Sequence, residues 1–364
     1  MGGVGIGIRF EKGCGMIREA LTFLEVAVNY ESMEVQMRKA LSRLGKSGAG
    51  LRKEIALQKA FLDAAFCYPV TVLTRKYFEK YRESGLGCLA RNLVWTFDAQ
   101  DAESVEEMKK RIRAAAVKYP WESFPDFSSY TGVDPELPLK GGRCSFLDSV
   151  RKAGIGEKFQ ARLIFAFQDL EGSLEELGEL LEGALQILEP FRKEMEAVAG
   201  EKRAYWQSYF AKHTMEDFFA LTGIYVDEKN YSQLLLRWEL VNGIHMSLKM
   251  DEDQEADTLE ILVGSLMNEE VIREWKKGGE RAALALMADP VKMDILLYVS
   301  QTPHFGREVA EHFGLTTATI SYHMQELVNE GLINVRQQGK RLYYSLNGER
   351  VREVLDRTAQ QLLG

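Results

Sequence analysis

Side chains that can both donate and accept hydrogen bonds recur along one short stretch near the end of this 364-residue chain. They lie within nine residues, at positions that leave the apolar residues of the stretch at helical spacing, and they are Thr317, Thr319, Ser321, Tyr322 and Gln325. On the exposed face of a helix, hydroxyl and amide groups match the donor and acceptor pattern of base edges in the major groove of DNA. The chemistry that these residues predict is sequence recognition by hydrogen bonds.

Basic side chains follow at the tip of a predicted β-hairpin. Residues 332–346 alternate apolar and polar side chains on either side of Gly339, a pattern that indicates two strands and a turn. The candidate contacts of this hairpin are Arg336, Gln338, Lys340 and Arg341. Cationic side chains bind phosphates, so we expect the hairpin to contact the DNA backbone.

Three predicted helices must position these side chains. The first begins after Asp289-Pro290, a cap followed by the proline that is favoured at a first helical position. The second covers residues 307–313 and ends at Gly314, which suits the left-handed turn after a helix. Thr316 is placed to cap the third helix, and it joins His323 of that helix among the candidate DNA contacts.

The order of helix, helix, turn, helix and basic hairpin is that of a winged helix-turn-helix, whose third helix enters the major groove while the wing reaches flanking phosphates. The stretch closely resembles the arsenic-repressor (ArsR) family of bacterial one-component regulators. The matching motifs are Ala288-Asp289-Pro290, Gly314-Leu315-Thr316, Thr319-Ile320-Ser321-Tyr322-His323, Glu330-Gly331-Leu332-Ile333 and Gly339-Lys340-Arg341 before Tyr343-Tyr344. The resemblance covers about sixty residues and implies a homodimer on double-stranded DNA. It implies nothing about the rest of the chain.

The charge of this stretch is low for a DNA-binding unit. Residues 281–349 hold six Lys and Arg against seven Asp and Glu, a net charge of −1, and the predicted third helix has no basic residue. Phosphate contacts supply much of the affinity for DNA. We therefore expect the hairpin to provide the positive charge and two copies to bind together.

A predicted helix at the end of the chain offers a surface for that pairing. After Asn347, the apolar residues Val351, Val354, Leu355, Leu362 and Leu363 lie close to one helical stripe. A short helix with such a stripe needs a partner surface. A second copy of the chain is the interpretation that we favour, and packing against its own domain is the alternative.

Composition is that of an ordinary soluble protein, with 46% apolar and 27% charged residues and a net charge of −8. Residues 350–364 contribute +1, so the −8 resides in residues 1–280, which we do not expect to touch DNA. Four separated cysteines, no signal peptide and no run long enough to span a membrane favour a cytoplasmic location. Residues 2–7 are expected to be a flexible end, and Met16 is an alternative start.

Helical patterns dominate the N-terminal part. The apolar spacing predicts helices over residues 17–44, 51–66, 70–83 and 104–118, and a longer one over 173–200 with a kink at Pro190. Prolines and glycines concentrate between residues 119 and 144, which indicates a linker or long loop.

The pattern changes from helical to alternating after Lys212. Residues 234–240 and 244–248 alternate around Asn242-Gly243, a strong hairpin signal, and residues 258–263 predict a further strand. Helices are expected at 268–277 and 281–287. The predicted fold class is mainly α with a small antiparallel β component (α+β), ending in the winged helix-turn-helix.

These patterns divide the chain into four predicted parts. Residues 1–120 form a helical N-terminal region, and residues 145–278 form a helical and β-hairpin region that binds an effector or organises a dimer. Residues 279–349 are the winged helix-turn-helix DNA-binding domain, and residues 350–364 are a dimerisation helix.

Several motifs resemble ligand-binding patterns but lack residues that those patterns require. Gly45-Lys46-Ser47 lacks the first glycine of a phosphate-binding loop, and the glycines of residues 2–7 follow no strand. The acidic residues 251–257 lack the glycine and closing glutamate of an EF-hand. No cofactor is predicted.

Many members of the arsenic-repressor family sense metals, but metal sensing is not expected here. Residues 307–313 contain no Cys and only His312, and residues 348–364 contain neither Cys nor His. We interpret His304 and His312 as structural, and His323 as structural or as a contact to the DNA backbone. His213 and His245 have no Ser, Cys or carboxylate partner at motif spacing, so no catalytic residue is predicted.

The hypothesis is therefore a bacterial transcriptional regulator. A homodimer binds a pseudo-palindromic operator, and an N-terminal region responds to an unknown small molecule or protein, with no part in a membrane. The alternatives are an enzyme-derived domain fused to a winged helix, for which a deep pocket with converging ionisable groups would argue, and a winged-helix scaffold for protein contacts.

Overall fold

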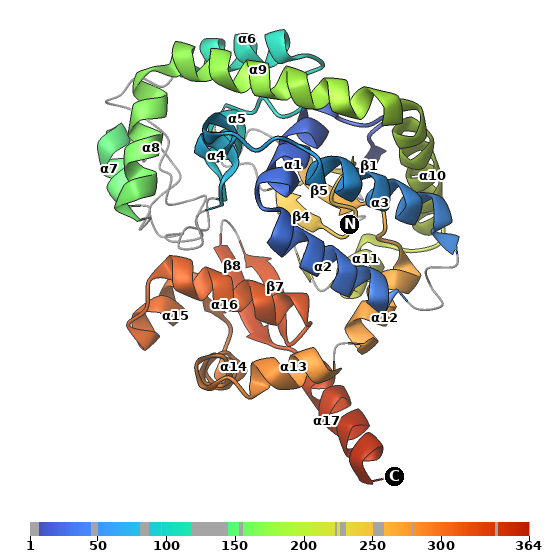
Figure 1. Ribbon diagram of the computed structural model, residues 1–364. Helices are drawn as coiled ribbons and strands as arrows, with labels where there is room; N and C mark the ends of the chain where they lie inside the picture. The colour runs from blue at the N-terminus through green and yellow to red at the C-terminus, as the bar shows by residue number, and fades with distance from the viewer. Residues whose placement is uncertain are drawn as a thin grey trace.

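The computed structural model describes residues 7–44, 50–80, 87–95, 97–117, 145–152, 156–222, 224–225, 231–249, 258–278, 280–338 and 341–363. Figure 1 shows a large helical N-terminal body around an enclosed sheet, and below it a smaller C-terminal unit. We use "N-terminal body" for the described residues up to 278 and "C-terminal unit" for those from 280 onward. The chain is mainly helical with two small sheets, as its patterns predicted.

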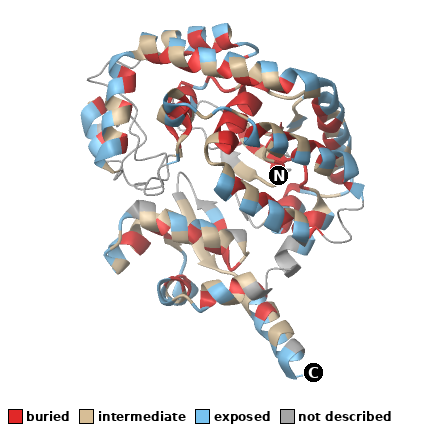
Figure 2. Cartoon of the chain, in the orientation of Figure 1, coloured by how far each residue is buried: buried red, intermediate tan, exposed pale blue. Residues whose placement is uncertain are grey.

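Helix α1 (Met16–Val28) lies at the centre of the N-terminal body, and every one of its side chains from Met16 to Ala27 is buried (Figure 2). It packs against α3 (Arg52–Phe66), α4 (Val72–Phe78) and α9 (Leu170–Leu188). The single helix predicted over residues 17–44 is instead α1 followed by α2 (Tyr30–Arg43). Asn29 separates them because its side-chain amide donates to the backbone oxygens of Glu25 and Phe78 and competes with the helical pattern.

The other helices of the N-terminal body surround α1. They are α5 (Leu89–Trp95), α6 (Val105–Ala116), α7 (Phe146–Lys152), α8 (Glu157–Gln168), α10 (Arg192–Phe210), α11 (Met215–Thr222) and α12 (Glu269–Gly278). A 3-10 turn, η2 (Glu189–Phe191), separates α9 from α10 at the predicted kink. Helix α4 is shorter than the 70–83 prediction, and the predicted linker at 119–144 lies outside the described residues.

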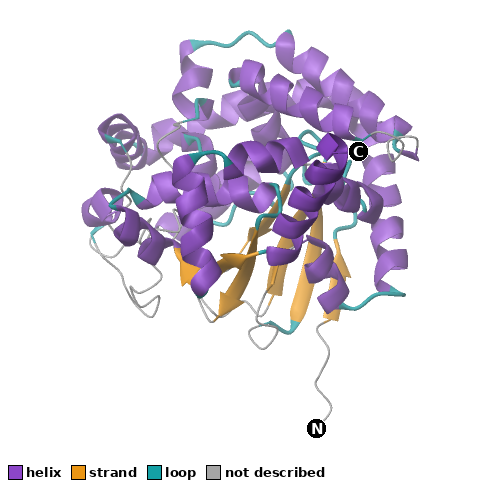
Figure 3. Ribbon diagram, turned by 90° about the horizontal axis from the view of Figure 1, so that it is seen from below, coloured by secondary structure: helices purple, strands orange, loops and turns teal. Residues whose placement is uncertain are grey.

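The sheet of the N-terminal body corrects the antiparallel prediction. Its strands are β1 (Gly7–Phe10), β3 (Gln233–Glu239), β4 (Met246–Lys249) and β5 (Thr258–Gly264), in the order β1-β3-β5-β4. Strands β1, β3 and β5 are parallel, and only β4 is antiparallel to its neighbour β5. Figure 3 shows these strands side by side with helices packed along them.

The hairpin predicted at Asn242-Gly243 is wrong, since β5 lies between β3 and β4. Side chains from two helices hold the connection after β3. The backbone amides of Leu240 and Val241 donate to Glu19, each at 2.9 Å, and that of Gly243 donates to Gln58 at 3.1 Å. These contacts replace the main-chain ladder that a hairpin would need. The predicted flexible end at residues 2–7 is wrong for Gly7, which begins the edge strand β1, and the rest of it lies outside the described residues.

The C-terminal unit contains the predicted winged helix-turn-helix. Its helices are α13 (Glu280–Met287), α14 (Pro290–Gln301), α15 (Gly306–Phe313), α16 (Thr317–Asn329) and α17 (Gly348–Leu363). Its strands are β6 (His304–Phe305), β7 (Ile333–Gln338) and β8 (Arg341–Leu346). A fourth strand, β2 (Ile224–Tyr225), comes from the N-terminal body and completes the order β2-β7-β8-β6.

Buried apolar residues form two clusters. One extends from Met16 to Ile272 and includes residues of both predicted N-terminal parts, which we therefore treat as one body. The other extends from Ala283 to Val354. None of the described helices combines the length and the apolar composition needed to cross a bilayer.

Candidate nucleic-acid interface

The first helix of the motif is fixed to the third by charged side chains. Asp289 caps α14 by accepting a hydrogen bond from the backbone amide of Lys292 at 3.0 Å, and Pro290 occupies the first helical position. The Lys292 ammonium lies 3.2 Å from Asp289 and 3.3 Å from Glu326 on α16. The start of α14 is thereby connected to the middle of α16.

The turn before α16 has the predicted geometry. Gly314 ends α15 with a φ of 62°, in the left-handed region, and the amide of Leu315 donates to the carbonyl of Ala310 at 3.0 Å. The Thr316 hydroxyl accepts a hydrogen bond from the amide of Thr319 at 3.1 Å. Thr316 is therefore the cap of α16, as the sequence indicated.

Helix α16 buries one face and exposes another. Ile320, Met324 and Leu327 are buried, whereas Tyr322 is 57% exposed and Gln325 is exposed. The Tyr322 hydroxyl donates to Glu326 at 3.1 Å, so its ring is held along the exposed face by the residue that also contacts Lys292.

The other candidate residues of α16 are less open. The side chains of Thr319 and Ser321 are half-buried, and that of Thr317 lies outside the described residues. His323 is half-buried with its Nδ1 facing inward, where it has no hydrogen-bond partner among the described residues. Burial lowers the pKa of His323, and the nearby Lys292 adds to this effect. The lowered pKa favours the uncharged form of the imidazole, which forms no ion pair with a phosphate.

The wing is the hairpin of β7 and β8, paired from Ile333 opposite Leu346 to Gln338 opposite Arg341. Arg336 is exposed on β7 and is in register with Tyr343. Gln338 and Arg341 end the two strands, but their side chains are not described, and Lys340 lies outside the described residues. The backbone places Arg341 at the turn end of the hairpin and Arg336 two register positions further along the ladder.

Tyr298 contacts two of the histidines of the C-terminal unit. Its ring is stacked between those of His304 and His312, with centroids 4.0 Å apart on each side. His304 also contacts Thr302 and Glu308. Among the residues that the structure describes, no three His, Cys, Asp or Glu side chains gather in a way that could hold a metal ion.

Helix α17 packs on the C-terminal unit along only its first half. Val354 is buried, and α17 contacts α13. Leu355 is 51% exposed, Leu362 78% and Leu363 86%, and Figure 1 shows the end of the helix projecting away from the rest of the chain. The stripe predicted from the sequence is therefore divided between packing on its own unit and an exposed apolar end.

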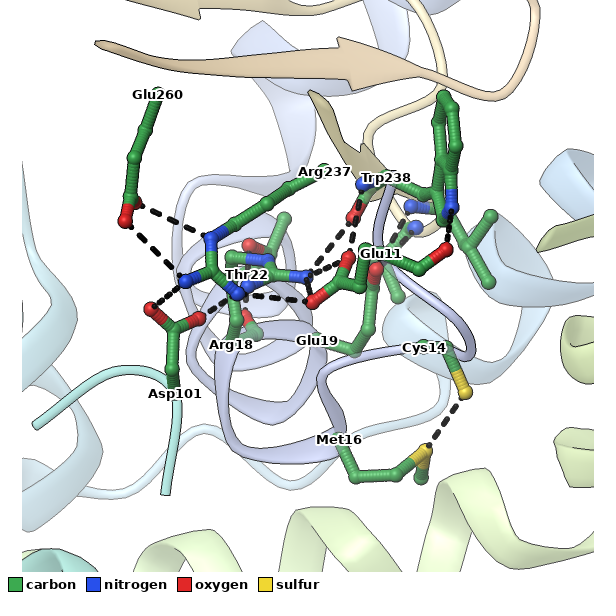
Figure 4. A network of polar contacts seen from close by, with 12 residues as sticks. Glu11, Cys14, Met16, Arg18, Glu19, Thr22, Asp101, Arg237, Trp238 and Glu260 are labelled. Carbon is green, nitrogen blue, oxygen red and sulfur yellow. Dashed lines mark hydrogen bonds and ion pairs between the residues drawn. The ribbon is translucent and has the colours of Figure 1, made fainter. Parts of the chain in front are cut away.

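A buried charged network in the N-terminal body was not foreseen from the sequence (Figure 4). The guanidinium of Arg18 donates to both carboxylate oxygens of Glu11, at 2.7 and 2.9 Å, and to Asp101 at 2.5 Å. Arg237 on β3 lies 3.0 Å from Asp101 and 3.1 Å from Glu260 on β5. These pairs connect the first turn of α1 with the residue that follows β1 and with positions inside β3 and β5.

The network continues along α1 with two more buried carboxyl groups. Burial and the neighbouring Glu239 raise the pKa of Glu19 to about 8, against the opposing effects of Arg18 and two backbone amides. Glu239 accepts a hydrogen bond from the Thr22 hydroxyl at 2.9 Å and contacts Nδ1 of His245. Burial opposes ionisation of Glu239, but His245 and Arg91 lower its pKa. His245 thus has a carboxylate partner, which no motif spacing could indicate.

Comparison with known proteins finds a family match within the C-terminal unit. The model of a family described as bacterial regulatory protein, arsR family, matches residues 289–335, which extend from the start of α14 into β7. The chain is 32% identical over 94 residues to a probable mercury resistance operon repressor of Streptomyces lividans, a match that covers 26% of this chain and 74% of that protein.

Two further matches cover a similar part of the chain's length. An arsenical resistance operon repressor of Staphylococcus xylosus is 33% identical over 66 residues, or 18% of this chain and 64% of that repressor. Among solved structures, NolR from Sinorhizobium fredii matches at 22% identity with a TM-score of 0.20, covering 24% of this chain and 89% of NolR. Because the similarity to the Streptomyces relative reaches 32% identity over 74% of its length, this chain belongs to the arsR family of bacterial regulatory proteins.

Proposed function

We propose that this chain is a transcriptional regulator that binds double-stranded DNA through α16 and the wing. The observation that carries the proposal is the exposed face of α16, where Tyr322 and Gln325 are open to a partner while the opposite face is buried. The relatives named as operon repressors support the same function. Base-edge contacts are assigned to the exposed residues of α16, and phosphate contacts to Arg336, Lys340 and Arg341 of the wing.

The binding unit is proposed to be a homodimer on a pseudo-palindromic operator. A C-terminal unit with a net charge near zero and no basic side chain on α16 has few phosphate contacts to offer alone. The exposed leucines at the end of α17 provide an apolar surface that a second copy would cover. Two wings then supply twice the positive charge, and the half-site spacing follows from the dimer.

The N-terminal body is proposed to receive a signal, either a small molecule or a protein. Residues 1–280 carry the whole net charge of −8, so they add no attraction for DNA. An effector changes DNA binding only if its affinity differs between the competent and incompetent arrangements of the chain.

One observation favours a second candidate, an N-terminal body derived from an enzyme. Glu239 contacts Nδ1 of the half-exposed His245, the arrangement in which a carboxylate orients an imidazole as a general base. His245→Gln should abolish any hydrolytic turnover that the purified chain shows on ester or amide substrates. Turnover that survives this substitution would remove His245 from consideration.

The test of the first proposal is selection of bound DNA followed by a variant. DNA that co-purifies with the crosslinked protein is sequenced, and binding to the enriched site is compared with binding to shuffled DNA. Tyr322→Ala should reduce specific binding by about 1–3 kcal/mol and leave non-specific binding almost unchanged. Gln301→Ala, at the exposed end of α14, is the matched control. Equal losses on both DNAs would remove Tyr322 from base recognition.

A further inference from the structure

Strand β2 joins the N-terminal body to the wing. We propose that this pairing is a clamp: while β2 is paired with β7, the N-terminal body holds the wing and lowers its affinity for DNA, and opening of the pair raises that affinity. The inference rests on the proposed function and names the route by which the N-terminal body regulates it.

The clamp occupies the outer edge of the wing. Strand β7 pairs with β8 on one side, and on the other side it pairs in parallel with β2, Ile224 opposite Val335 and Tyr225 opposite Arg336. Without β2, the backbone N–H and C=O groups on that side of β7 would form an open sheet edge. Addition of a strand to such an edge is a general mode of recognition through main-chain hydrogen bonds. Here the added strand comes from the same chain, and each of its residues lies 111 positions before its partner in β7.

Strand β2 is anchored in the N-terminal body through α11. The ring of Phe218 on α11 is buried against Trp206 and Phe210, with centroids 5.4 and 5.3 Å away. Thr214 and Asp217 form reciprocal hydrogen bonds at the start of the helix. A displacement of α11 within this aromatic cluster would therefore carry β2 with it.

The C-terminal unit is consequently attached to the N-terminal body at two points. The covalent connection runs through α12, which packs against α2 and α11. The second connection is the β2–β7 pair. Among the residues that the structure describes, β2 and β7 share two paired positions, whereas β7 and β8 share six. The clamp is thus much weaker than the wing hairpin, and it can open while the hairpin stays intact.

Charge determines which state binds DNA more tightly. The wing provides the basic residues Arg336, Lys340 and Arg341. Strand β2, which belongs to residues 1–280 with their net charge of −8, pairs with the strand that carries Arg336. Phosphates that approach the closed wing meet this negative charge, which lowers the affinity at low salt. Screening over about 10 Å at roughly 0.1 M salt limits the effect, so raising the salt should shrink the difference between closed and open states.

The experiment uses full-length variants and the DNA site that the wild-type chain enriches. Ile224→Pro/Tyr225→Pro removes both backbone N–H groups of β2, whereas Ile224→Ala/Tyr225→Ala shortens the side chains and keeps those groups. Hydrogen exchange over residues 333–338 reports the pairing, and tryptophan fluorescence reports folding of the N-terminal body. We expect the proline variant to expose wing amides and to bind about three- to tenfold more tightly at roughly 50 mM salt, with the gain shrinking as salt rises. The alanine variant should resemble the wild-type chain.

A crosslink tests the closed state directly. Ile224 and Val335 are register partners, so Ile224→Cys/Val335→Cys brings two thiols to neighbouring strands. The oxidised protein should bind the site less tightly than the same protein after reduction, and Val335→Cys alone should show no such difference. The native cysteines are present in both proteins, so the single variant also controls for their oxidation.

The outcomes separate the inference from the proposed function. Unchanged exchange of the wing amides in a folded proline variant, or changed exchange with equal or weaker DNA binding, overturns the clamp. Equal binding by the oxidised and reduced double-cysteine protein overturns it independently. If neither the wild-type chain nor any variant prefers an enriched DNA site, the proposed function itself is wrong.

Discussion

The N-terminal body and the C-terminal unit differ in how many charged side chains they bury. The only charged side chains classed as buried in the described part of the C-terminal unit are Lys292 and Arg350. In the N-terminal body, the central helix α1 alone buries Arg18, Glu19 and Glu25. Charges removed from water are costly unless they are paired, so α1 is stable only because distant segments supply its partners.

The sequence separation of those partners explains why one region was predicted well and the other was not. In the C-terminal unit, local signals such as the Asp289 cap and the Gly314 turn lie within a few residues of what they fix. In the N-terminal body, Arg18 pairs with Asp101, and Glu19 pairs with the amides of Leu240 and Val241, more than 200 residues away. A periodic pattern contains no information about such pairs.

The largest expected effect comes from breaking the network at its centre. Arg18→Met keeps the length of the side chain but removes one of the two guanidinium groups that the half-buried carboxylates of Glu11 and Asp101 share, and Arg237 remains beside both. We expect a loss of about 3–4 kcal/mol in the free energy of unfolding of the N-terminal body, in the lower part of the range for buried pairs that lose one member, because Arg237 still compensates part of the charge. All five tryptophans lie within residues 1–280, so tryptophan fluorescence during urea unfolding reports this region alone.

The matched control is Arg52→Met, because Arg52 is an exposed arginine at the start of α3. It should unfold at the urea concentration of the wild-type chain. If both variants lose the same stability, the network around Arg18 contributes no more than an exposed arginine does, and the contrast between the two regions disappears.

A smaller effect on the stability of the same region should depend on pH. Glu19 has a pKa raised to about 8, so the folded N-terminal body resists its ionisation. A raised pKa of an acid means stability that is fully present below the ordinary value of about 4.5 and is lost as the pH rises through about 8. Glu19→Gln removes this group, and we expect the drop in unfolding free energy between pH 5 and pH 9 to shrink by roughly 2–4 kcal/mol.

The control for this prediction is Glu31→Gln, at an exposed position of α2. Its pH dependence should match that of the wild-type chain. A Glu19→Gln variant whose stability falls between pH 5 and pH 9 as steeply as that of the wild type would place the pH-sensitive group elsewhere.

Which parts of the fold were predictable from the sequence depends on the same difference between local and distant contacts. Most helices, the Pro190 break and the complete winged helix-turn-helix were predictable, because each depends on caps, turns or a helical period. The pairing of β3 was not, since Asn242-Gly243 has the sequence of a hairpin turn while Glu19 and Gln58 hold its backbone in another path. Strand β2 is two residues long and pairs with a distant strand, so no local pattern could indicate it.

Substitutions in the wing should change DNA binding without changing the stability of the N-terminal body. Replacing Arg336, Lys340 and Arg341 together with Gln should weaken binding to every sequence. With roughly 0.9 of salt slope for each phosphate contact, the dependence of log K on log salt should flatten by about 2.7 per C-terminal unit. That difference amounts to about 40-fold, or roughly 2 kcal/mol, over a fourfold range of salt. An unchanged slope would assign the phosphate contacts to other residues.

The smallest expected effect is on sequence preference when the N-terminal body is removed altogether. If the signals that build the C-terminal unit are local, a fragment of residues 280–364 should fold, because its buried cluster from Ala283 to Val354 lies entirely within it. It should dimerise through α17 and select the same DNA site as the full chain, since every proposed base contact lies on α16. Its affinity will differ if the clamp operates, so the comparison is between the enriched sequences and not between the binding constants. A folded, dimeric fragment that selects a different site, or none, would mean that the N-terminal body takes part in recognition and that the two regions are not separable in this way.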